Sequence, residues 1–211
     1  ERWFNGQAGG YVPNMLNQLN QAAMDQTLRD TRSAADKLMA RIPMLSQNLP
    51  AKRDSLGQEM QAGDRWAGPA PLRNSIQSDS PVYAEMSRLA QHMDKPFEPL
   101  SPNRAQYKID LRDYKNKDGV SFYDELGRRI GEEKGRRNKT LHDELEQYIS
   151  SYKYKKKADG DPEYGSPKMT LLRKRIKNAQ QYHEARMLRE PEWKEVKEAL
   201  KREKKLRQEF R

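Results

Sequence analysis

The chain has 211 residues, no cysteine, and a formal net charge of +10 that comes from 41 Lys and Arg against 31 Asp and Glu. Without cysteine it has no disulfide framework and no thiolate metal site, and no apolar run approaches the ~18–20 residues of a membrane-spanning helix. Leu, Ile, Val and Phe make up about 16% of the residues, below the ~20% at which a highly charged chain becomes a candidate for disorder. We therefore expect little independent core and ordering by partner subunits.

The charge is unevenly distributed. Residues 1–100 carry equal numbers of acidic and basic side chains, so the whole net charge comes from residues 101–211, which also hold eight of the ten tyrosines. Eight prolines fall between Pro43 and Pro102. The pattern predicts a helical docking segment at 1–42, a Pro-rich extended linker with one short helix at 43–100, and a basic helical region at 101–211. Because the chain opens at Glu1 rather than Met, we expect it to be a piece of a larger protein.

The first half predicts two short helices and a long loop. Pro13 can occupy the first turn of a helix with Leu16 and Leu19 on one face. A second helix, capped by Asp30 or Thr31, would carry Leu38 and Ile42 and end at Pro43. Residues 43–79 lack periodicity and read as a long loop, of the kind that is functional or bound by a partner.

Three Ser-Pro pairs, at residues 80–81, 101–102 and 166–167, place proline at the first position of a helix. Ser121 and Thr140, each followed three residues later by Asp, predict two further N-caps. Pro191 ends the helix that begins at Pro167 and can start the last one. No segment shows the alternation of a strand, so the fold class is all-α, with serial short helices joined by long Pro-rich linkers.

Basic runs in the second half predict contact with a polyanion. Clustered cations beside tyrosines can neutralise nucleic-acid phosphates without reading bases. The alternative is a solvated helix face, since Glu and Lys also alternate at i, i+4 spacing along 192–209. No zinc finger, helix-turn-helix or aromatic RNA-binding motif indicates sequence-specific recognition. The candidate nucleic-acid contacts are Lys155, Lys156, Lys157, Arg173, Arg175, Lys204 and Lys205.

The sequence predicts neither catalysis nor a metal, cofactor or small-molecule site. His92, His142 and His183 are widely spaced, and none has a second histidine at ligand spacing. Residues 159, 161 and 163 are acidic at the spacing that opens a calcium loop, but Tyr164 stands where the loop needs glycine. We expect a polar turn there. The carboxylate pairs Glu132-Glu133 and Glu144/Glu146 lie among Lys and Arg, where solvated ion pairs are the usual arrangement.

The Met- and Gln-rich first half is better suited to packing on a partner protein than to lying on a membrane. Methionine adapts to irregular surfaces, and the first helix lacks the basic polar face of an interfacial helix. The candidate protein-docking residues are Leu16, Leu19, Leu38, Ile42, Met44 and Leu45.

Four segments resemble the C-terminal portion of a known class of viral protein. They are "RDTR" at 29–32, "ARIPMLSQNLPAKRDSLG" at 40–57, "SPVYAEMSRLAQHM" at 80–93 and "LSPNRAQY" at 100–107. Together they are similar to the large polyvalent internal proteins of short-tailed bacteriophages, which are packaged in the capsid and ejected into the host. The Lys-rich stretch 152–157 and the basic tail depart from that pattern.

The resemblance implies a non-enzymatic virion segment, with any catalytic module lying upstream in a larger parent chain. It would dock on the portal or on sister ejection proteins, in several copies around a channel, and face the packaged DNA. Its location would be the capsid interior and then the host envelope or cytoplasm. Two alternatives stay open: a basic helical nucleic-acid-binding or ribonucleoprotein subunit unrelated to phage, and an enzyme fragment with an oligomerisation tail.

Overall fold

The computed structural model describes residues 27–40, 42, 45–60, 80–104 and 109–209. The chain forms two units, one comprising Glu1–Lys52 and Glu59–Ser78 and the other Arg53–Gln58 and Asp79–Arg211. The helix at 81–93 therefore belongs with the C-terminal helices, although the sequence pattern placed it in the linker. Its apolar face is buried by helices that come later in the chain.

The first unit contains the helix α3 (Ala34–Met39) and the 3₁₀ turn η1 (Ser46–Asn48). The Ser33 hydroxyl caps α3 by accepting from the Asp36 N–H, and the Asp36 carboxylate accepts from the Ser33 N–H, so the N-cap lies two residues beyond Thr31. Extended segments join by backbone hydrogen bonds from Leu28 to Met60, from Lys52 to Leu28 and from Met60 to Lys52, at 2.6–2.8 Å.

Helices dominate the second unit, and the all-α fold class is confirmed. Four of its helices begin where the sequence predicted, because Ser80, Ser121, Thr140 and Ser166 each accept a hydrogen bond from a backbone N–H of the first turn. The elements in chain order are α4 (Pro81–Met93), α5 (Phe122–Glu132), α6 (Leu141–Ser150), α7 (Tyr152–Lys155), α8 (Pro167–Met187), η3 (Pro191–Trp193) and α9 (Lys194–Glu209).

The helix predicted from Ser101-Pro102 is wrong. In its place, β1 (Asn103–Arg104) pairs antiparallel with β2 (Ile109–Asp110), and a turn with Gly119 at a φ of +79° leads to α5. Ile109 and Leu111 are both buried, 7% and 0% exposed. They alternate with Asp110 and Arg112, which pair with each other at 2.7 Å. This short period-2 pattern overrides the helix-start signal.

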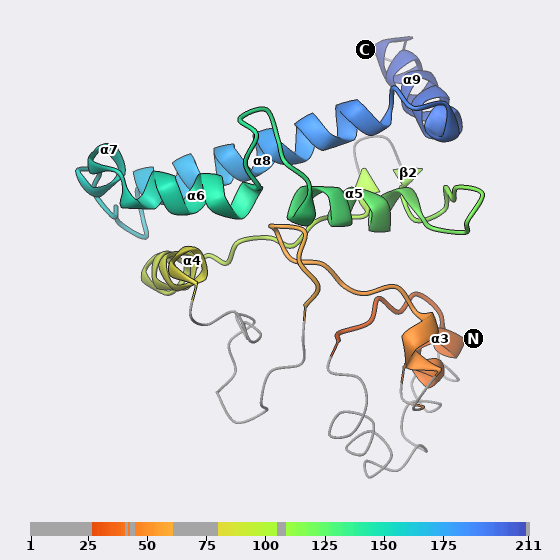
Figure 1. Cartoon of the computed structure of the whole chain (residues 1–211), viewed down its shortest axis with the longest axis horizontal. Coiled ribbons are helices and arrows are strands. Elements are labelled where there is room, and N and C mark those ends of the chain that lie inside the picture. Colours follow the sequence, from red (N-terminus) through yellow and green to blue (C-terminus); the bar gives the residue numbers. More distant parts are fainter. Residues whose placement is uncertain (1–26, 41, 43–44, 61–79, 105–108, 210–211) are drawn as a thin grey trace. The chain divides into compact units, whose positions relative to one another are not determined.

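The core of the second unit lies around α8, which contacts α4, α5 and α6 (Figure 1). This core is larger than expected from the scarcity of Leu, Ile, Val and Phe. The count omitted methionine, tyrosine and tryptophan, which here fill much of the interior. The buried residues of these three types are Tyr83, Met86, Met93, Tyr123, Tyr154, Met169, Met187 and Trp193.

The acidic stretch at 159–163 is a polar turn, as predicted. Asp161 and Gly165 exchange backbone hydrogen bonds, and the Asp161 carboxylate accepts from the Glu163 N–H. Asp159 instead binds Arg88 of α4 at 2.8 Å and Lys168 of α8 at 2.7 Å. The turn therefore ties α4 to the start of α8.

Segment 53–58 packs against α5 through glycine. Gly57 has a φ of +81°, and a Cβ there would lie 2.3 Å from the Gly127 carbonyl oxygen. Gln58 Nε2 donates to the Gly131 carbonyl at 3.1 Å. Asp54 accepts a hydrogen bond from the Tyr83 hydroxyl, which fixes the segment to α4 as well.

Among the described residues, no helix is both long and apolar enough to cross a membrane.

Candidate functional site

A tight loop between α5 and α6 carries the first group of cations. The Gly135 N–H donates to the Lys139 carbonyl at 2.9 Å, and Asn138 adopts a φ of +57°, a conformation that asparagine tolerates well. Thr140 then caps α6. The side chains of Arg136, Arg137 and Lys139 project from this loop and are exposed.

Helix α8 supplies the opposite wall, and α6 and α8 lie side by side (Figure 1). Between α8 on one side and the loop with the start of α6 on the other is a groove of about 910 Å³, which we call the α6–α8 groove. Its lining holds seven basic side chains and a single acidic one, Glu144. The basic residues are Arg136, Arg137, Lys139, Lys174, Arg175, Arg186 and Arg189.

The acidic groups near the groove neutralise only part of this charge. Glu144 Oε1 binds Arg137 at 3.0 Å and Arg175 at 2.8 Å, and Arg186 reaches Glu133 at 3.2 Å. Within the described residues, no ion pair involves Arg136, Lys139, Lys174 or Arg189. The groove therefore keeps a net positive charge open to solvent.

Two tyrosines hold arginines in place along the groove. The Arg175 guanidinium lies 3.6 Å from the ring centroid of Tyr148, and Arg136 lies 5.7 Å from that of Tyr182. Stacking of this kind orients a planar guanidinium while leaving N–H donors at its edge for an anion such as phosphate. Ordered cations lose less entropy when they bind.

His183 lies in the groove lining but is 1% exposed. Its Nδ1 atom has no hydrogen-bond partner among the described residues. Burial lowers the pKa of this imidazole, and the nearby Arg186 and Arg129 lower it further, against the opposing effect of Glu133. His183 is therefore neutral at pH 7 and adds no positive charge to the groove.

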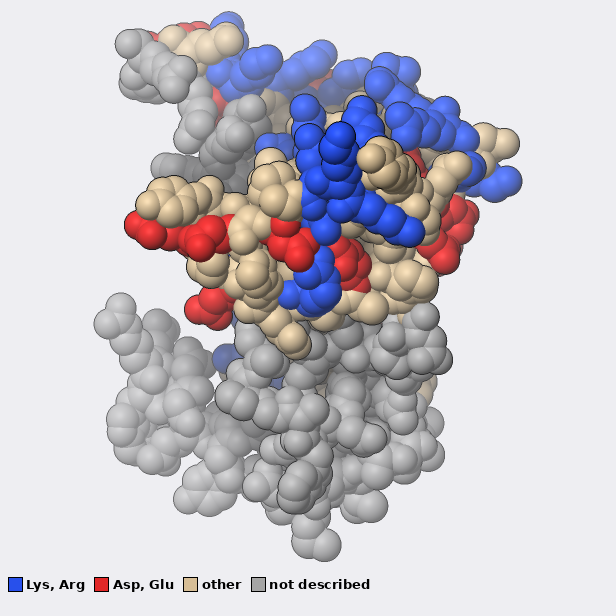
Figure 2. Space-filling model, turned by 90° about the vertical axis from the view of Figure 1, so that its left-hand side faces the viewer, with Lys and Arg blue, Asp and Glu red and all other residues tan. Residues whose placement is uncertain are grey.

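The structure separates the nucleic-acid contacts predicted from sequence. Arg175 lines the groove, whereas Arg173 lies on the Phe97 ring at 5.6 Å and donates to the Pro96 carbonyl. Lys155, Lys156 and Lys157 are exposed at the end of α7, on a face where Lys and Arg gather above a band of Asp and Glu (Figure 2). Lys204 and Lys205 are exposed on α9. Of the predicted contacts only Arg175 lines this groove, and nucleic-acid contact by any of them stays a prediction.

The loop cations were missed because "GRRNK" at 135–139 is a short run with no helical periodicity. The groove itself joins residues more than thirty positions apart, which no local pattern reveals. A second missed arrangement is the pair Ser80 and His142, with Oγ and Nε2 2.6 Å apart. His142, Asp143 and Glu146 also bring one possible metal-ligand atom each within 4.8 Å of one another.

The predicted protein-docking residues lie in the first unit. Leu38, Ile42 and Leu45 are 38%, 43% and 41% exposed, which is high for large apolar side chains. Leu16, Leu19 and Met44 lie outside the described residues. The first predicted helix, starting at Pro13, lies outside them as well. Docking through these positions stays a prediction.

Comparison of the chain with protein-family models, with curated proteins and with solved structures finds no match.

Proposed function

We propose that this chain is a non-enzymatic helical module that binds nucleic-acid phosphates without reading bases, through the basic groove between α6 and α8. The observation that carries the proposal is the ratio of charges in the groove, seven Lys and Arg to one Glu. Lysine and arginine that neutralise phosphates release condensed counterions, and this supplies most of the free energy of non-specific binding. The exposed Lys155, Lys156 and Lys157 at the end of α7 add further positive charge to the unit.

The setting that we favour comes from the sequence resemblance. In a short-tailed phage, the groove would face packaged DNA inside the capsid, and the exposed Leu38, Ile42 and Leu45 would dock on the portal or on sister ejection proteins. Several copies would surround a channel and enter the host with the genome. The alternative is a cellular nucleic-acid-binding or ribonucleoprotein subunit, which the same groove would also suit.

Binding is tested by fluorescence anisotropy with two labelled duplexes of unrelated sequence, over a series of salt concentrations. The intact chain is expected to bind both equally, with log K falling linearly as log salt rises. The triple variant Arg136→Gln/Lys139→Gln/Lys174→Gln should weaken binding and reduce that slope by about 2–3, since each phosphate contact contributes about 0.9. A matched control is Lys37→Gln/Lys52→Gln/Lys117→Gln, which removes three exposed lysines outside the groove.

Equal slopes for the two triple variants would contradict a role for the groove. A strong preference for one duplex would contradict the absence of base readout. The phage setting is tested separately, by mass spectrometry of nuclease-treated virus particles before and after genome release. Peptides of this chain should be present in the full particles and depleted in the emptied ones.

A further inference from the structure

Helix α9 is attached to the rest of the unit at its start. Trp193, just before it, is 1% exposed and packs edge-to-face on Phe122 with ring centroids 5.1 Å apart, and Val196 is also 1% exposed. Beyond Val196, burial falls away along the helix, and Leu206 is 46% exposed. Most of α9 therefore presents side chains that nothing in the described part of the chain covers.

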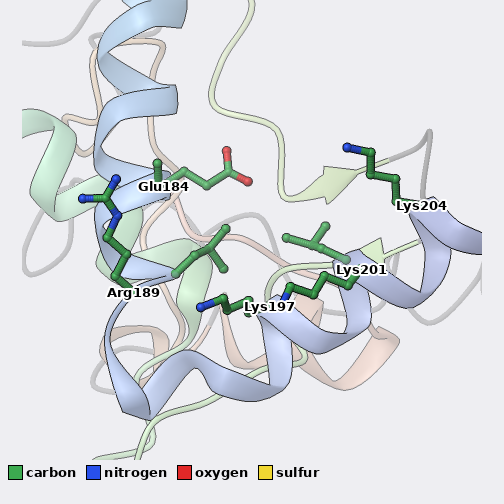
Figure 3. Close-up of a pocket in the computed structure, with 8 residues that line it drawn as sticks. Glu184, Arg189, Lys197, Lys201 and Lys204 are labelled. Atoms are coloured by element: carbon green, nitrogen blue, oxygen red, sulfur yellow. The ribbon is translucent and has the colours of Figure 1, made fainter.

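An apolar groove of about 510 Å³ runs between the last turns of α8 and this uncovered part of α9 (Figure 3). Its apolar lining, which we call the floor, consists of Ala185 and Leu188 on one side and Leu200 on the other. Leu188 and Leu200 are only half-buried. Burying a leucine fully is worth about 1.5–3 kcal/mol, so these side chains favour a partner that covers them.

The rim of this groove is basic. Lys197, Lys201 and Lys204 lie on one face of α9, at i, i+4 and i+7, and Arg189 lies across the groove from them (Figure 3). The one acidic residue in the lining is Glu184. Within the described residues, no ion pair involves these four cations.

Two of the four glutamates of α9 pair with cations outside the groove. Glu198 lies 3.9 Å from Lys194 and 4.0 Å from Arg202, and Glu209 lies 3.9 Å from Lys205. These two glutamates are thus engaged away from the groove, whose lining holds four cations and one acidic residue, Glu184.

We propose that the α8–α9 groove is a docking site for an acidic amphipathic helix of a partner protein. The apolar face of that helix would cover Leu188 and Leu200, and its flanking carboxylates would meet Lys197, Lys201 and Lys204. An amphipathic helix in an apolar groove is a recurring recognition mode, and complementary charges select the partner and speed association.

The groove fits this occupant better than the other polyanions. Nucleic acid would use the cations but would leave the apolar floor uncovered, because phosphates need no apolar contact. An anionic bilayer would need apolar side chains that project from a helix face. Here they line a groove between two helices, where the side chains of a docked helix can reach them. The two grooves share Ala185 and Arg189, so the variants below leave both of these residues unchanged.

The test uses the full chain and a fluorescein-labelled synthetic helix of about five turns, with leucine at i, i+3, i+4 and i+7 and glutamate on the flanks. A scrambled peptide of the same composition, which has no apolar face, is the first control. The intact chain should bind the amphipathic peptide at least about tenfold more tightly than the scrambled one. Equal binding of the two peptides, or no binding of either, would overturn the proposal.

Two variants separate floor from rim. Leu188→Ser/Leu200→Ser removes the apolar floor without changing charge and should weaken peptide binding at least about tenfold, with unchanged affinity for duplex DNA. Lys197→Gln/Lys201→Gln should weaken binding more than Lys155→Gln/Lys156→Gln, which removes the same charge from exposed positions elsewhere. Thermal unfolding followed by circular dichroism checks that every variant is folded.

Three outcomes would contradict the inference. One is a floor variant that binds the peptide as well as the intact chain does. Another is equal effects from the two lysine pairs. The third is a floor variant that loses binding to phosphatidylserine vesicles or to DNA instead of to the peptide, which would assign the groove to lipid or to nucleic acid.

Discussion

At the scale of single residues, Gly57 sets how closely segment 53–58 approaches α5. Its φ of +81° is strained for any residue with a Cβ, and a Cβ there would lie 2.3 Å from the Gly127 carbonyl oxygen. Gly119 has nearly the same φ, +79°, but nothing lies within 4 Å of its added Cβ. The two glycines therefore separate the cost of backbone strain from the cost of a steric clash.

We predict that Gly57→Ala lowers the free energy of unfolding by more than about 2 kcal/mol, since strain and clash add, whereas Gly119→Ala costs about 1 kcal/mol. Urea unfolding of the two variants measures both values. Equal destabilisation would show that segment 53–58 moves away from α5 without cost.

His183 predicts a pH dependence of stability near neutrality. Because its pKa is lowered by burial, the unfolded chain binds a proton below about pH 6.5 that the folded chain does not. The neutral His183 therefore makes its full contribution to the free energy of unfolding above that pH. This contribution is lost as the pH falls toward the lower pKa of the folded state. Over this range the free energy of unfolding falls by at most about 1.4 kcal/mol per pH unit on account of His183.

Replacing the imidazole removes this dependence. Urea unfolding between pH 7 and pH 5 should show a smaller decline for His183→Leu than for the unaltered chain. The control is Gln181→Leu, which places leucine at an exposed position of the same helix and should keep the original decline. An unchanged decline in His183→Leu would mean that the imidazole titrates equally in both states.

At the scale of elements, the caps explain what the sequence could reveal. Ser166-Pro167 and Ser101-Pro102 carry the same local signal, yet only the first begins a helix. After Pro167, apolar residues keep helical spacing for five turns, whereas Ile109 and Leu111 impose a strand-like alternation soon after Pro102. Helix starts were predictable because they depend on adjacent residues. The basic groove was not, because its two walls are far apart in the sequence.

The start of α6 gives a test at this scale. The Thr140 hydroxyl accepts a hydrogen bond from the Asp143 N–H at 3.2 Å. Thr140→Ala should lower the free energy of unfolding by about 1 kcal/mol, while Thr140→Ser, which keeps the oxygen, should cost far less. Urea unfolding compares them, and similar losses in both variants would point to the lost methyl group rather than the cap.

At the scale of the whole molecule, ion pairs within helices and between distant segments make the fold sensitive to acid. Hydrogen bonds from Arg88 and Lys168 lower the pKa of Asp159, and those from Arg128 and Arg129 lower that of Glu125 against burial. Because these carboxylates have lower pKa values in the folded than in the unfolded chain, their ionised forms stabilise the fold above about pH 4.3. This stabilisation is lost as the pH falls through the pKa values of the folded chain. Protonation also leaves the excess positive charge to repel itself.

We predict that the urea midpoint falls between pH 5 and pH 3, and falls less in Arg88→Gln, which has already lost one contribution. Arg202→Gln is the control, since Arg202 is 80% exposed and 4.0 Å from its partner Glu198. If the Arg88 and Arg202 variants lose stability in parallel with the unaltered chain, the link between α4 and residue 159 does not contribute.

The burial of Trp193 against Phe122 has an optical consequence. The other tryptophans of the chain are Trp3 and Trp66, and both lie in the first unit. In a Trp3→Phe/Trp66→Phe variant, all indole emission would come from the base of α9. Its wavelength would shift to the red only when solvent reaches that base. A single fluorescence channel would then report on the C-terminal helices alone, while circular dichroism records the helices of both units.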